Sequence, residues 1–136
     1  MLSGRFLQLP SNHKVIGAPQ VVDSFATKDA INAWDKNAEV LYDDAASLRI
    51  KAFNIPHTWP QRHSKVQNIA YLVELNGVRI LHLVDADTNP DAFNNTEMGS
   101  IDAAIVPAWF ISNGDGKKII EKLKAKKNCC YSYCPG

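Results

Sequence analysis

The clearest pattern in the chain is the strand-like arrangement of apolar and polar positions in its middle third. Residues 48–55, 68–75 and 78–84 alternate apolar and polar side chains or form short apolar runs, as β-strands do. Asn76 and Gly77 separate the last two segments, and this dipeptide favours a type I′ turn because both positions need positive φ. The pattern predicts a β-hairpin over residues 68–84.

Helix-like and strand-like segments alternate on either side of this hairpin. Helices are expected over residues 19–34, 90–99 and 116–126. Pro19 and Pro90 suit the first position of a helix, and Asn89 and Asp115 can cap a helix N-terminus. Further strands are expected at residues 14–17, 40–42, 102–107 and 128–133. A hairpin among helical crossovers predicts an α/β fold with a mixed β-sheet and flanking helices.

Two of the expected strands, in residues 69–75 and 103–106, are apolar on both faces. Such strands need cover on both sides of the sheet. The helices expected at residues 90–99 and 116–126 can cover one side only. The other side therefore needs either the first 45 residues of the chain or a second molecule.

Length, composition and charge narrow the class of protein. The 136 residues suit one compact domain, and the net charge of +1 is small. Lysines are concentrated in residues 117–127 and lack interleaved aromatic residues. We therefore expect them to form the solvent-exposed face of a helix, and we expect no nucleic-acid partner. No apolar run is long enough for a membrane span, so no membrane partner is expected. All three cysteines fall in the last eight residues, which is no disulfide framework, and a cytoplasmic location is expected.

A family resemblance rests on three motifs: Ile55-Pro56-His57-Thr58, the hairpin of residues 68–85, and Ile101 to Pro107. In this order and spacing, residues 48–136 resemble the second half of the metallo-β-lactamase-fold hydrolases, which form an αββα sandwich. Residues 6–42 look like the segment that follows the first metal motif of that family. The resemblance implies that residues 1–136 form a single truncated metallo-β-lactamase-like domain.

The resemblance also implies a metal site. His57 matches a histidine ligand of the family and Asp85 matches the aspartate that bridges its two metal ions, and each ends a predicted strand. Zinc, or iron or manganese, suits such ligands. The family's His-x-His-x-Asp-His motif is absent, Val84 replaces the usual glycine, and Ser132 stands near the position of the final histidine. Any metal ion is therefore expected to bind weakly at this site or to be absent from it.

Other roles for the same side chains remain open. His63 and His82 could be recruited as ligands, although His82 falls on the opposite strand face from Asp85, as expected of a sheet histidine. Asp85 and Asp87 could instead cap the turn that follows them.

The cysteines and tryptophans also have two interpretations. Cys129, Cys130 and Cys134 could bind a soft metal or be inert thiols. Trp59 and Trp109 fit the wall of a pocket near the candidate site, and core packing explains them equally well.

Two functions follow from these observations. The first is a truncated relative without hydrolase activity of its own, which persists as an oligomerising or binding module. Its uncovered sheet face predicts a homodimer that packs sheet against sheet. The alternative is a metal-dependent hydrolase of an ester, lactone or phosphodiester, whose site is completed by another chain or by missing N-terminal residues.

Overall fold

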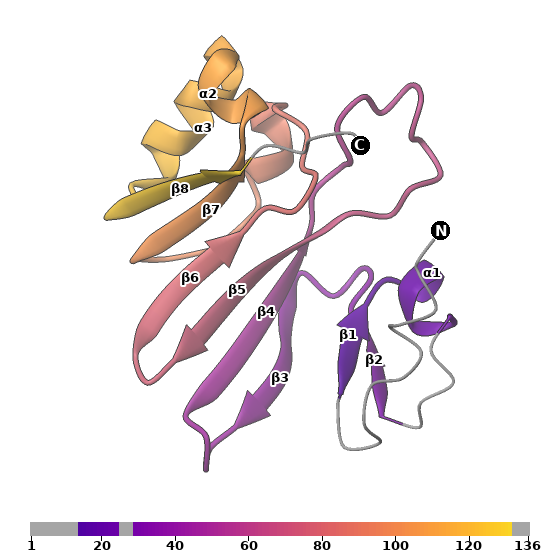
Figure 1. Ribbon diagram of the computed structural model, residues 1–136. Helices are drawn as coiled ribbons and strands as arrows, with labels where there is room; N and C mark the ends of the chain where they lie inside the picture. Colours follow the sequence, from indigo (N-terminus) through magenta and orange to yellow (C-terminus); the bar gives the residue numbers. More distant parts are fainter. Residues whose placement is uncertain (1–13, 25–28, 132–136) are drawn as a thin grey trace.

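A computed structural model describes residues 14–24 and 29–131, and its larger β-sheet has six strands in the order β3-β4-β5-β6-β7-β8 (Figure 1). These strands are β3 (Ala38–Asp43), β4 (Leu48–Asn54), β5 (Ile69–Leu75), β6 (Val78–His82), β7 (Ala103–Pro107) and β8 (Lys127–Tyr131). Neighbours from β3 to β6 pair antiparallel, whereas β6, β7 and β8 run parallel. The predicted α/β class with a mixed sheet is confirmed.

The hairpin of β5 and β6 forms as predicted. Asn76 and Gly77 have φ of 50° and 80°, so both central turn positions have the positive φ that a type I′ turn needs. Leu75 pairs with Val78 across the turn. The last strand, β8, begins one residue before its predicted start, and the end of that prediction, at residues 132–133, lies outside the described residues.

The N-terminal part forms a small separate sheet, in which β1 (Val15–Gly17) and β2 (Ala30–Asn32) pair in parallel. The helix predicted over residues 19–34 is therefore wrong beyond its first turn. Only α1 (Pro19–Val22) is helical, and residues 25–28 lie outside the described part. Ala33 is fully buried, and its N–H donates to the carbonyl of Gly17 at 2.8 Å, so tertiary pairing overrides the local helical preference of this segment.

The helix predicted over residues 90–99 is also shorter than expected. Asn89 accepts from the N–H of Asp91 at 3.0 Å, as its predicted capping role requires, but the element is a single 3₁₀ turn, η2 (Pro90–Phe93). The Thr96 hydroxyl donates to the carbonyl of Phe93 at 2.8 Å. Such local side-chain bonds compete with the helical backbone and end the turn.

Two helices lie over the β7 and β8 end of the sheet (Figure 1), namely α2 (Trp109–Ser112) and α3 (Gly114–Leu123). The short α2 was not predicted. Asn113, rather than the predicted Asp115, caps α3, because its side-chain oxygen accepts from the N–H groups of Asp115 and Gly116 at 2.8 and 3.3 Å. Helix α3 ends before the predicted residue 126, where Lys124 adopts a φ of 49°.

The main core lies between the large sheet and these helices. Leu72 and Leu81 from the central strands pack there with Phe93, Phe110 and Ile119 from the helical elements. A smaller cluster on the other sheet face joins the N-terminal unit to β4 and β5. Its buried members are Ala18, Ala33, Ala52 and Ile69. No helix in the described ranges is long and apolar enough to span a membrane.

The remainder of that second face is apolar and is not covered by described residues. Strand pairing aligns Ile50, Val73, Ile80 and Ala103 across four strands. We call this surface the open sheet face and define it by Ile50, Val73, Leu75, Val78, Ile80, Ala103 and Ile105. Leu75, Val78 and Ile80 are 47%, 51% and 37% exposed. Within the described ranges, the N-terminal unit thus covers only the part of this face near Ala52 and Ile69.

Candidate ligand site at the strand ends

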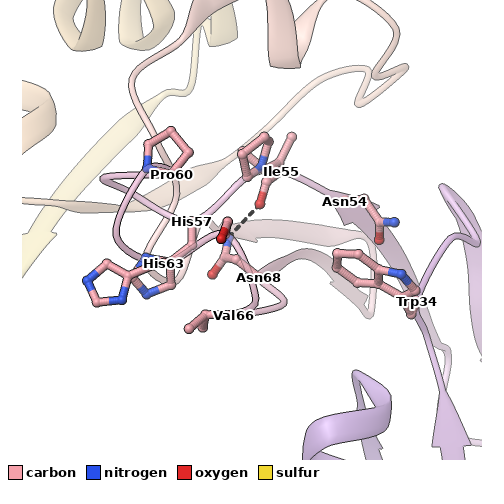
Figure 2. Close-up of a pocket in the computed structure, with 10 residues that line it drawn as sticks. Trp34, Asn54, Ile55, His57, Pro60, His63, Val66 and Asn68 are labelled. Atoms are coloured by element: carbon pink, nitrogen blue, oxygen red, sulfur yellow. Dashed lines mark hydrogen bonds between the residues drawn. The ribbon is translucent and has the colours of Figure 1, made fainter.

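Asn68 joins the segments that leave three neighbouring strands. This buried residue lies just before β5, and its amide donates to the carbonyl of Ile55 after β4 at 3.0 Å (Figure 2). Its side-chain oxygen accepts from the N–H of Asp85 after β6 at 3.1 Å. The N–H of Thr58 then donates to the carbonyl of Asp85 at 2.8 Å. These bonds hold the segment after β4 against the segment after β6.

The strand ends bring His57 and Asp85 together. Their nearest side-chain atoms, Nε2 and Oδ2, lie 3.7 Å apart. Nδ1 of His57 lies 2.7 Å from the carbonyl oxygen of Thr58 and must donate to it, because a carbonyl only accepts. In the neutral ring Nε2 is then an acceptor, so two acceptors face one another. This arrangement favours a hydrogen-bond donor or a cation that both atoms can contact.

Val84 shapes the turn that carries Asp85. Its φ of 56° lies in the left-handed region, which a β-branched residue enters only at a cost. The N–H of Val84 donates to Nδ1 of His82 at 3.1 Å, and the N–H of Ala86 donates to the carbonyl of Leu83 at 3.2 Å. These bonds compensate the strained backbone and fix where Asp85 leaves the strand.

A tight turn brings His63 back to His57. The carbonyl of Trp59 accepts from the N–H groups of Arg62 and His63 at 2.9 and 3.0 Å. The His63 ring centre lies 4.7 Å from that of His57, and Figure 2 shows the two rings next to each other. The indole of Trp59 stacks on His63 with ring centres 6.4 Å apart. Trp59 has a φ of 52° and is 64% exposed, which is unusual for a tryptophan.

His82 lies in the sheet, as its position in the strand predicts. It ends β6, and its ring stacks on Tyr131 with centres 5.6 Å apart. Burial lowers the pKa of His82, and the negative charge of Asp85 partly opposes that shift. Burial, with a smaller contribution from Asp85, raises the pKa of Tyr131 to about 12. The field of Asp85 therefore extends to this pair, although neither ring lines the cavity described next.

An open cavity of about 950 Å³ lies beside these residues. It is lined by His57, Thr58, Trp59, Pro60, Gln61, His63, Asp85, Asp87, Thr88, Trp109 and Asn113. The Trp109 indole N–H donates to the carbonyl of Ala86 at 2.9 Å, which fixes that side chain as one wall. Both tryptophans thus lie at the pocket, as the sequence suggested.

A second cavity of about 230 Å³ extends from His57 and His63 toward Trp34 at its far end (Figure 2). Its other lining residues are Asn54, Ile55, Pro56, Pro60, Ser64, Val66 and Asn68. His57 and His63 line both cavities, and the second cavity has no Asp, Glu, Lys or Arg among its described lining residues.

The donor set does not fit a resident metal ion. A catalytic zinc normally has three protein ligands and an open position. Within residues 14–24 and 29–131, no group of three or more His, Cys, Asp or Glu side chains is placed to hold a metal. Cys129 and Cys130 are exposed on β8, whereas Cys134 and Ser132 lie outside the described residues. The metal-ligand role of His57 and Asp85 stays a prediction.

The comparison with known families identifies the class of this protein. Residues 8–128 match the family model described as "Beta-lactamase superfamily domain". The chain belongs to that superfamily, as the motifs around His57 and Asp85 predicted. Neither the curated proteins nor the solved structures include a match to this chain.

Sequence reasoning found His57 and Asp85 but missed the residues that position them. Asn68 was assigned only as the start of a strand. Its burial was the missing signal, because a buried amide next to strand ends must find partners. The capping role considered for Asp85 and Asp87 is not seen, since neither carboxylate accepts a hydrogen bond from a backbone N–H in the described part.

Proposed function

We propose that this chain is a non-catalytic member of the β-lactamase superfamily that associates into a homodimer through its open sheet face. The observation that carries the proposal is the exposure of Leu75, Val78 and Ile80 on neighbouring strands. Soluble monomers rarely leave such a continuous apolar surface in water.

The geometry of the face suits a two-fold dimer. Ile80 lies near its middle, paired with Val73 on one side and Ala103 on the other. Two flat apolar sheets can pack about 10 Å apart with their side chains interdigitated. In a two-fold interface, every such contact occurs twice. A substitution at Ile80 therefore changes the interface in both subunits.

Sedimentation equilibrium of the full chain at micromolar concentration tests this proposal. The wild type is expected to be a dimer, and Ile80→Lys is expected to weaken association at least ~10-fold, or about 1.4 kcal/mol. Ile111→Lys is the matched control, because Ile111 is 49% exposed on α2, away from the open sheet face. A wild type that is strictly monomeric, or equal weakening in both variants, would refute the dimer.

The alternative function is a metal-dependent hydrolase of an ester, lactone or phosphodiester, with a site completed by another chain. The approach of His57 Nε2 to Asp85 Oδ2, at 3.7 Å, favours it. Metal analysis of the purified protein separates the two proposals. Stoichiometric zinc, iron or manganese, with a hydrolytic activity that a chelator removes, would favour the hydrolase. The non-catalytic proposal expects metal well below one ion per chain.

A further inference from the structure

Two carboxylates line the 950 Å³ cavity together with the imidazoles of His57 and His63. Asp85 and Asp87 are among its lining residues, and no described lysine or arginine is. Within the described ranges, no lysine or arginine forms an ion pair with either carboxylate, and the basic side chain nearest to one of them is His57, at 3.7 Å from Asp85. The cavity therefore attracts positive charge.

The walls are aromatic as well as acidic. Trp59 and Trp109 both line the cavity, and His57 and His63 line it and the second cavity as well. Indole faces attract organic cations, and the attraction increases when water is excluded. A tryptophan that is 64% exposed and held at a φ of 52° is costly to keep unless the position has a use.

The size of the cavity indicates the kind of cation. A volume of about 950 Å³ is in the range of small-molecule sites and far exceeds what a bare metal ion needs. The donor set is also too small for a resident metal, because the described residues supply no group of three ligands. An ammonium group with an apolar body satisfies both the carboxylates and the indoles.

We propose that this cavity binds an organic ammonium cation, with the charged nitrogen near Asp85 and Asp87 and its alkyl groups against Trp59 and Trp109. The site is separate from the open sheet face, since none of the residues that define that face lines it. The inference therefore does not depend on the proposed dimer.

Choline and its neutral carbon isostere, 3,3-dimethylbutan-1-ol, test the proposal because they differ only in charge. Binding to the full chain is measured by calorimetry and tryptophan fluorescence, with a chelator present, at about pH 8, above the usual titration range of imidazole. We expect saturable choline binding with a Kd on the order of 1 mM, and binding of the isostere at least ~10-fold weaker.

Variants then locate the site. Asp87→Asn and Trp59→Ala should each weaken choline binding at least ~5-fold. Asp23→Asn and Tyr42→Ala are matched controls, because both residues are exposed and outside the cavity, and both variants should bind like the wild type. Equal affinity for the two ligands, no binding up to about 50 mM, or unchanged affinity in both cavity variants would overturn the proposal.

Discussion

Replacement of Gly116 by alanine should destabilise the protein even though alanine is the better helix former. Gly116 lies in α3, where the chain turns sharply out of α2. A Cβ atom added there would lie 2.5 Å from both the Cα and the carbonyl oxygen of Phe110. Phe110 is fully buried in the main core, so its backbone cannot move aside freely.

The expected magnitude comes from two opposing effects. Alanine gains up to about 1 kcal/mol over glycine in a helix interior. Overpacking costs about 1–3 kcal/mol, and a clash with backbone belongs at the upper end of that range. The net loss in the free energy of unfolding is therefore about 1–2 kcal/mol. Gly114→Ala is the matched control, because a Cβ there would meet nothing within 4 Å.

Urea unfolding of both variants, followed by circular dichroism at one protein concentration, measures this difference. The midpoint should fall for Gly116→Ala with an unchanged slope, and should stay the same or rise slightly for Gly114→Ala. The reasoning about close packing is refuted if Gly116→Ala is as stable as the wild type or as Gly114→Ala.

Three further predictions follow from capping and ionisation. Asn113→Ala removes the cap of α3 and should lower the free energy of unfolding by ~1 kcal/mol in the same urea assay; no change would contradict the capping role. The hydrogen bond from Lys126 lowers the pKa of Asp102 from 3.8, so this carboxylate stabilises the fold above that pH and the contribution is lost as the pH falls through the lowered pKa. Asp102→Asn should flatten the acid dependence of the urea midpoint, and an unchanged dependence would count against it. The phenol of Tyr131, with a pKa of about 12, stabilises the fold below pH 10.0 and loses that contribution as the pH rises toward 12. Burial also raises the pKa of Tyr71, so ultraviolet titration should show late phenolates, and Tyr131→Phe should remove the one near pH 12.

The elements predicted correctly are those whose signals are local. The hairpin at Asn76 and Gly77 follows from backbone conformations that few residue pairs adopt readily. The strands on either side follow from their alternation. Asn89 accepts from the N–H two residues later, a bond that depends only on its neighbours. Such features are fixed within a few residues, so the chain specifies them by itself.

The wrong predictions are those in which contacts with distant residues determine the local secondary structure. Residues 30–32 of the helix predicted over residues 19–34 form strand β2 instead. They pair with β1, and Ala33 packs in one cluster with Ala52 and Ile69. Asn113 rather than Asp115 caps α3, since the chain first forms the unpredicted α2, which buries Phe110 in the core. In both places, burial against another segment outweighs a weak local preference.

The sequence by itself determined the α/β class, the superfamily and the two strand-end residues His57 and Asp85, because motif order and periodicity carry that information. Only the tertiary structure decided that Asn68 ties those strand ends together and that His63 folds back on His57. It also decided that the carboxylates lie in a cavity with two tryptophans. These are contacts between segments far apart in the chain, and no local pattern encodes the distance between them.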